Sequence, residues 1–260
     1  MLKKILICLI AISSSQIVLS ETPICISLGG ACGPAIMLRQ LGLRTEAYPF
    51  DWIISSFESF QKAFLSDFEF FLTHLTERTD KIGVIDYYGF HFTHDWPTVN
   101  APNIDSLHAD YVGNYKLIST WETTVPLVKE KYKRRIERLK KICQGSSKVI
   151  FIREITGNPP QSDLHPHQQE AVMIRDLFRT KYPNLDFMIV ALSSSEIAKT
   201  DWGLENIKNV YFPVWDNSRH LAEILHEIDP VFDYLLHRTI QPFDLDCNCH
   251  LSCQYSGCND

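Results

Sequence analysis

The stretch Ile24-Cys25-Ile26-Ser27-Leu28-Gly29-Gly30-Ala31-Cys32-Gly33-Pro34 decides how this chain folds. Its first five residues form a short, mainly apolar run that is typical of a buried strand. The two glycines that follow predict a tight turn, and Pro34 suits the first position of a helix. Cys32 is therefore expected just ahead of a helix N-terminus, where unpaired N–H groups and the helix dipole favour a thiolate over a thiol. We expect any chemistry of this protein at Cys32.

The second half of the sequence alternates between apolar strands and helices. Strands are predicted at 148–153, 187–192 and 210–214, and helices at 168–182 and 219–228. Buried apolar strands separated by crossover helices are typical of parallel sheets. Residues 21–245 are therefore predicted to form a single α/β domain, with three layers and a mostly parallel central sheet covered by helices on both faces. The strand at 24–28 is expected at the centre of that sheet.

The first half of the sequence is rich in aromatic residues. Residues 57–75 are predicted to be helical, and residues 84–94 to be one extended strand that places His94 on the same face as Phe90 and Phe92. Residues 98–120 are irregular and polar, and a loop over the site is expected there. An amphipathic helix is predicted at 125–143.

The N-terminus reads as a secretory signal peptide. Lys3 and Lys4 precede a short apolar run and then small residues, so residues 1–20 are expected to be cleaved off before Glu21. An uncleaved membrane anchor is the weaker reading, because the apolar core is about half of the ~20 residues that a span requires. The sequence predicts an exported protein, periplasmic or extracellular, with no integral membrane segment after cleavage.

The overall charge argues against two classes of partner. A formal net charge of −6 and an isoelectric point near 5.9 disfavour binding to nucleic acid or to an anionic membrane. The basic run from Lys129 to Lys141 lies on the amphipathic helix, where it is expected to form a solvated face opposite an apolar stripe.

The cysteine count predicts disulfides. Eight cysteines are present, and Cys8 would leave with the signal peptide. Seven cysteines in an oxidising compartment suggest three bridges and one remaining thiol, for which Cys32 is the candidate. The tail at 246–260 is expected to hold two local disulfides, with a zinc site as the alternative. Its metal-ligating side chains are Cys247, Cys249, His250, Cys253 and Cys258.

The carboxyl ends of the predicted parallel strands are where functional residues gather in such sheets. They are 29–32, Arg153-Glu154, 193–195 and Trp215-Asp216. Arg153 follows an apolar strand, so it should either pair with a carboxylate, such as Glu154 or Asp216, or bind an acidic group of a substrate.

Several segments together resemble a known family. They are Ser27-Leu-Gly-Gly-Ala-Cys32, Leu38-Arg-Gln-Leu-Gly-Leu-Arg44, Tyr48-Pro-Phe-Asp-Trp52, Phe92-Thr-His-Asp-Trp96 and Phe151-Ile-Arg153. These segments resemble a bacterial family of unknown function that is described as papain-like cysteine peptidases, and the resemblance spans residues 24 to 215. The resemblance implies Cys32 as nucleophile and His94 as base. Because the strand–helix alternation predicts a three-layer sheet, "papain-like" is expected to describe the catalytic residues and not the fold.

The leading hypothesis is therefore an exported cysteine-nucleophile hydrolase, either a peptidase or amidase or an acyltransferase, acting on a peptide or on a small acyl or amide substrate. N–H groups of the turn that begins at Gly33 would hold the oxyanion. A third residue should orient His94, with Asp51, Asp110 and Asp216 as candidates. No nucleotide-binding glycine loop or metal-binding motif predicts a cofactor.

Two other readings remain open at this stage. In the first, the protein is exported but not catalytic, and Cys32 forms a structural bridge with Cys25 or Cys143. In the second, the same sheet carries an esterase-like enzyme with Ser27 or a serine at 193–195 as nucleophile, although no Gly-x-Ser-x-Gly elbow is present.

Overall fold

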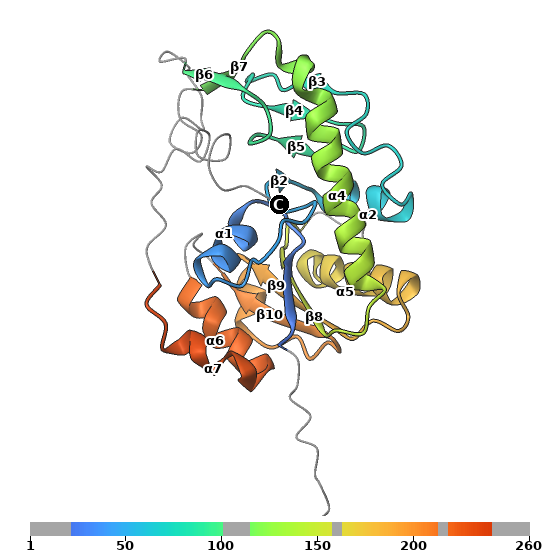
Figure 1. Cartoon of the computed structure of the whole chain (residues 1–260). Coiled ribbons are helices and arrows are strands. Elements are labelled where there is room, and N and C mark those ends of the chain that lie inside the picture. The colour runs from blue at the N-terminus through green and yellow to red at the C-terminus, as the bar shows by residue number, and fades with distance from the viewer. Residues whose placement is uncertain (1–21, 101–114, 158–162, 213–217, 241–260) are drawn as a thin grey trace, which may run out of the picture.

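The computed structural model describes residues 22–100, 115–157, 163–212 and 218–240 (Figure 1). Its centre is a four-stranded, all-parallel sheet in the order β1-β8-β9-β10. The strands are β1 (Ile24–Ser27), β8 (Val149–Glu154), β9 (Phe187–Ser193) and β10 (Ile207–Tyr211). The expected signal peptide at 1–20 and the tail at 246–260 lie outside the described residues.

Helices cover both faces of this sheet, as Figure 1 shows. One face carries α1 (Gly33–Gln40), α6 (Ser218–Ile228) and α7 (Asp233–Leu236). The other carries α2 (Phe57–Leu65), α4 (Val125–Cys143) and α5 (Pro166–Lys181). The predicted three-layer α/β fold with a parallel sheet is confirmed.

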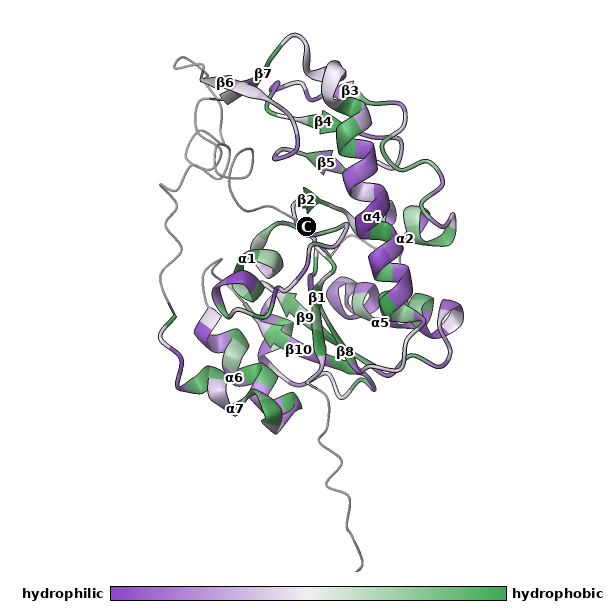
Figure 2. Ribbon diagram, viewed as in Figure 1, coloured by the Kyte–Doolittle hydropathy of each residue, from purple (hydrophilic) through white to green (hydrophobic). Residues whose placement is uncertain are grey.

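Strand alternation divides the core between the two faces. Ile150 and Ile152 of β8 pack with α1 and α6, whereas Val149 and Phe151 pack with α4 and α5. Both sets are buried, so the first four residues of β8 are apolar in succession, which is typical of a parallel strand covered on both sides. Figure 2 shows the strands of this sheet as largely hydrophobic.

The position of β1 differs from the prediction. Among the strands of the described residues it pairs with β8 alone, which places it at an edge of the sheet, while β8 and β9 are the central strands. The order of parallel strands is decided by where each crossover connection places the next strand, and hydrophobic patterning carries no information about that.

A second group of short elements lies above the parallel sheet in Figure 1. An antiparallel sheet has the order β2-β5-β4-β3, with β2 (Ile53–Ile54), β5 (His91–Phe92), β4 (Val84–Ile85) and β3 (Thr76–Glu77). Strands β6 (Thr98–Asn100) and β7 (Tyr115–Leu117) form a separate pair. Three 3-10 helices are η1 (Trp121–Thr124), η2 (Glu196–Lys199) and η3 (Pro230–Phe232).

The helix predicted at 57–75 is shorter than expected. It ends at Leu65, because Asp67 and Phe68 both adopt left-handed backbone conformations, with φ of 55° and 66°. The Phe68 N–H donates to the Ala63 carbonyl at 2.8 Å, which closes the helix end. Phe68 still packs in the core with Phe64, so burial of the aromatic side chain is kept although the helix stops.

The strand predicted at 84–94 is also interrupted. Asp86 accepts hydrogen bonds from the N–H groups of Leu72, Tyr88 and Phe90, and these bonds fold the chain into a turn between β4 and β5. His94 follows β5 instead of lying inside a continuous strand. The facing argument for His94 therefore fails, and its surroundings are decided by tertiary contacts.

Gly30→Ala tests the turn that carries Cys32. Gly30 has φ of +93°, and an added Cβ would clash with the Glu154 carbonyl oxygen and come within 2.8 Å of the Glu154 Cβ. We expect a loss of about 3 kcal/mol or more in unfolding free energy, measured by urea denaturation. The matched control is Gly203→Ala, where φ is +63° and nothing lies within 4 Å of the added Cβ. That change should cost about 1 kcal/mol, and equal losses in the two variants would contradict the account.

Candidate active site

Cys32 lies where the sequence predicts, as the residue that caps the N-terminus of α1. Gly29 and Gly30 make the turn before it with positive φ values of 74° and 93°. Ser55 fixes this turn from the side: the Gly30 N–H donates to the Ser55 Oγ at 3.1 Å, and the Ser55 N–H donates to the Gly30 carbonyl at 3.0 Å. Cys32 itself is partly exposed. The turn therefore presents a thiol on a rigid backbone.

The first turn of α1 places backbone donors beside this thiol. Gly33 opens the helix, and the Ile36 N–H already donates to the Cys32 carbonyl at 3.0 Å. The N–H groups that precede it in a helix have no partner within the helix, and Pro34 has no N–H at all. In this first turn, Gly33 and Ala35 are therefore the residues whose N–H groups have no partner within the helix.

The two other described thiols differ sharply from Cys32. Cys25 and Cys143 are 4% and 2% exposed, and burial raises the pKa of each to about 12. They belong to hydrophobic clusters on opposite faces of the sheet. No disulfide joins Cys25, Cys32 and Cys143 to one another. The structural bridge considered for Cys32 is therefore not formed with either of these partners.

His94 lies against the segment that contacts the Cys32 turn. Its ring meets the Trp52 ring edge-on, with centroids 6.0 Å apart. Trp52 is three residues from Ser55, so this short segment joins His94 to the turn. Burial lowers the pKa of His94, the Asp95 charge opposes that shift, and Lys131 adds to it. A lowered pKa keeps the imidazole neutral near pH 7 and able to accept a proton.

Asp51 is connected to His94 through two other side chains. Its Oδ2 accepts hydrogen bonds from the Arg44 Nε at 2.8 Å and from the Tyr48 N–H at 3.1 Å. The Arg44 guanidinium lies 5.4 Å from the centroid of the Trp52 ring, which in turn contacts His94. Burial raises the pKa of Asp51, and Arg44 opposes that shift. Asp51 thus joins Arg44 to the Tyr48 backbone within this segment, while the candidates Asp110 and Asp216 lie outside the described residues.

Asp95 ties the His94 segment to α4. Its carboxylate accepts hydrogen bonds from the Lys131 Nζ at 2.6 Å and from the Tyr132 hydroxyl at 2.9 Å. Burial alone would raise the pKa of Asp95, but Lys131 and the nearby Arg135 charge bring it below its usual value. The residue that follows His94 is therefore held in place as an anion.

Arg153 is buried and fully engaged. Its guanidinium donates to the Leu28 carbonyl, to the Oγ and carbonyl oxygen of Ser55, and twice to Glu170, over distances of 2.8 to 3.2 Å. These five bonds use all five donors of an arginine, and the side chain has no exposed surface. All five donors of Arg153 are therefore used within the protein, which favours the structural role of the two roles considered.

The carboxylate that pairs with Arg153 is Glu170 of α5, which was missed by sequence reasoning. Its second oxygen accepts hydrogen bonds from Thr156 and from the Gly157 N–H, so it is fully satisfied. A signal was present: Glu170 occupies a core-facing position of α5 beside Ala171. The expected partners were instead Glu154, the next residue along β8, and Asp216, which lies outside the described residues.

Two of the four serines considered as nucleophiles have structural partners, whereas Ser194 is exposed. Ser27 is 1% exposed and its Oγ accepts from the Gly29 N–H at 3.1 Å. Ser193 is also 1% exposed; its Oγ lies 2.8 Å from the His167 Nδ1 and accepts from the Ser195 N–H. Burial keeps both hydroxyls away from a substrate.

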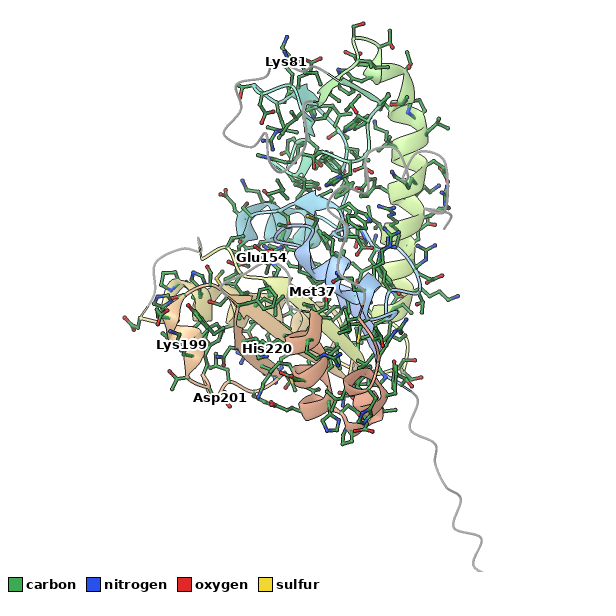
Figure 3. The ribbon with its side chains drawn as sticks, turned by 90° about the vertical axis from the view of Figure 1, so that its left-hand side faces the viewer. Met37, Lys81, Glu154, Lys199, Asp201 and His220 are labelled. Carbon is green, nitrogen blue, oxygen red and sulfur yellow. The ribbon has the colours of Figure 1, made fainter. Side chains whose placement is uncertain are left out.

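A cavity of about 410 Å³ lies at the outer edge of the sheet, between η2, β10 and α6. Its polar lining includes Lys199, Asp201 and His220, which Figure 3 labels. The strand at this edge is β10, whereas Cys32 follows β1 at the opposite edge. Within the described ranges, no three His, Cys, Asp or Glu side chains are grouped to hold a metal ion. The zinc set considered for the tail falls outside those ranges.

Arg153→Met tests the buried network. It leaves Glu170 buried without its cation, so we expect a loss of about 3–5 kcal/mol in unfolding free energy, measured by urea denaturation. Lys199→Met is the control, because it breaks an ion pair with Glu196 in which both side chains are exposed. The control should hardly change stability. A similar effect of both substitutions would mean that the Arg153 network does not hold the site together.

Comparison with protein families finds one match for this chain. Residues 24–196, more than half of the chain, match the family described as "Putative papain-like cysteine peptidase (DUF1796)". The chain is also 29% identical over 147 residues to "Uncharacterized protein R408" of Acanthamoeba polyphaga mimivirus. That alignment covers 52% of this chain and 63% of the viral protein, so the chain spans less than two thirds of this relative's length.

No solved structure matches the chain significantly. The relative found is viral, and a specifically bacterial origin of the family resemblance stays a prediction. The family match covers the Cys32 turn, the Trp52 segment, His94 and Arg153. The chain therefore belongs to the family of putative papain-like cysteine peptidases, DUF1796.

Proposed function

We propose that this protein is a hydrolase of peptides or small amides that uses Cys32 as its nucleophile. The observation that carries the proposal is the position of Cys32 as the cap of α1, partly exposed on a turn fixed by Ser55. Of the three described cysteines, it is the one outside the hydrophobic core. The same fixed turn offers backbone N–H groups to the oxyanion.

The reaction needs a base, and His94 is the proposed one. Its neutral imidazole would accept the proton of the Cys32 thiol, and the thiolate would attack the substrate carbonyl carbon. The N–H groups of Gly33 and Ala35 would hold the resulting oxyanion. Collapse would break the carbonyl–nitrogen bond, with the proton passing from His94 to the leaving amine. Water would then hydrolyse the thioester and restore the thiol.

Asp51 supports this pair from a distance. The contacts that run from Asp51 through Arg44 and Trp52 to His94 support a role in holding the imidazole in place. We therefore propose a positioning role for Asp51 and a catalytic role for Cys32 and His94.

We further propose that the protein acts after export. The support is the signal-like sequence of residues 1–20. Among the residues described, none of the helices combines the length and the apolar character that crossing a membrane would need.

Alkylation of the native protein tests the nucleophile. After mild reduction, iodoacetamide at about pH 6.5 should modify Cys32 faster than it modifies a model thiol, because the α1 N-terminus and His94 favour the thiolate. Cys25 and Cys143 should stay unmodified, since burial raises their pKa values to about 12. The readout is site-resolved mass spectrometry. Cys32→Ala should fold normally, and a Cys32 that reacts no faster than the model thiol would refute the proposal.

His94→Gln tests the base. We expect the alkylation rate of Cys32 near pH 6.5 to fall by about tenfold or more, because the thiol loses its proton acceptor. The far-UV circular dichroism spectrum should not change. His237→Gln is the matched control, since that imidazole is 78% exposed at the far end of α7. An unchanged rate in His94→Gln would remove His94 from the mechanism and leave Cys32 to be tested by itself.

A further inference from the structure

We propose that the Glu154 carboxylate forms part of the substrate site beside Cys32 and selects peptides with a lysine or arginine side chain next to the reacting carbonyl group. This inference rests on the proposed cysteine chemistry and adds the substrate class. It is drawn from the place of Glu154 in the sheet, its contacts with the Cys32 turn, and the state of its charge.

The first argument is the position of Glu154 in the sheet. Glu154 is the last residue of β8, and strand alternation places its side chain on the same face as Ile150 and Ile152. Those two isoleucines pack with α1. Because β1 and β8 are parallel, their carboxyl ends lie side by side, and α1 begins there after Cys32. Glu154 and the start of α1 therefore lie on the same face of the sheet, at the carboxyl ends of its strands.

Ser193 gives a useful contrast. It is also the last residue of its strand, β9, but its side chain faces α5, where it meets His167. A position at the carboxyl end of a strand therefore does not by itself place a side chain near Cys32. The side chain must also lie on the face that α1 covers, as that of Glu154 does.

The second argument is direct contact with the turn. The Glu154 N–H donates to the Gly29 carbonyl at 2.9 Å. A Cβ added to Gly30 would lie 2.8 Å from the Glu154 Cβ, so nothing larger than a hydrogen fits between the two residues. Gly30 is two positions before Cys32. Figure 3 shows Glu154 at the upper edge of the parallel sheet, between the sheet and the elements above it.

The third argument concerns hydrogen-bond partners. The other carboxylates of the site are all satisfied: Asp51 by Arg44, Asp95 by Lys131, and Glu170 by Arg153. Glu154 is partly buried, yet within the described part of the chain no group donates a hydrogen bond to its carboxylate. A partly buried carboxylate without protein donors has lost part of its hydration, and a ligand that donates hydrogen bonds would restore the missing partners.

The charge balance specifies what that ligand carries. The Arg153 charge is matched by Glu170 at 3.1 Å, so the charge of Glu154 is left over. Burial raises the pKa of Glu154 to about 7; Arg153 opposes this shift and Glu170 adds to it. A substrate ammonium or guanidinium group would supply both the donors and the opposite charge.

The test uses the charge selectivity of Cys32 labelling, which requires no known substrate. Two methanethiosulfonates of similar size are compared, one carrying a trimethylammonium group and one a sulfonate. In each reaction the Cys32 thiolate attacks the reagent sulfur, a disulfide forms, and methanesulfinate leaves. The rates for Cys32 are followed by site-resolved mass spectrometry at about pH 8, where the Glu154 carboxylate is ionised.

Glu154→Gln should lower the ratio of cationic to anionic labelling rates about fivefold, since the carboxylate attracts one reagent and repels the other. The variant should be at least as stable as the native protein at this pH. The folded-state pKa of Glu154 lies above its unfolded value, so the native protein loses stability as pH rises toward 7, and the variant does not. Glu137→Gln is the control, an exposed carboxylate on α4 across the sheet.

The possible results separate the two proposals. A ratio that is unchanged in Glu154→Gln, with Cys32 still labelled, would overturn the role of Glu154 and leave the cysteine chemistry standing. A ratio that falls equally in Glu137→Gln would also overturn it, because a remote charge would then explain the selectivity. A Cys32 that neither reagent modifies would overturn both proposals.

Discussion

The site depends on the hydrogen bonds and the ion pair that the Arg153 guanidinium makes. It is buried between the carbonyl of Leu28 at the end of β1, the Ser55 segment and Glu170 of α5. An unpaired cation in that position would be strongly destabilising, so the three elements are held in one arrangement around it. The Ser55 Oγ, which accepts from Arg153, also accepts a hydrogen bond from the Gly30 N–H, so the same network holds the turn that carries Cys32. The network therefore fixes the strand end, the turn and the Trp52 segment relative to one another.

The carboxylates around the site differ in whether a cation is paired with them. Asp51 pairs with Arg44 and Asp95 pairs with Lys131. Burial lowers the pKa of His94, which favours a neutral imidazole near pH 7. Glu154 is the exception, since its carboxylate has no donor among the described residues. Natural proteins keep such local penalties mainly at functional sites, which is why Glu154 bears on the substrate and not on the fold.

The family description and the architecture refer to different features of the molecule. The family is named for papain-like peptidases, while the protein is a three-layer α/β structure with four parallel strands. A thiol at a helix N-terminus with a nearby imidazole can be built on unrelated folds, because the chemistry needs only those groups in reach of one another. In the proposed site the thiol lies in the first strand–helix turn, and the imidazole belongs to the segment that follows β5.

The sequence by itself determined the local features of this protein. Two glycines and Pro34 required a strand, a turn and a helix start around Cys32, and apolar periodicity defined α4 and the strands of the parallel sheet, because these depend on neighbours along the chain. Only the tertiary structure decided that β1 lies at an edge, that Glu170 pairs with Arg153, and that Trp52 meets His94. Those outcomes join residues far apart in sequence, where periodicity and propensity carry no information and crossover geometry and the pairing of buried charges decide.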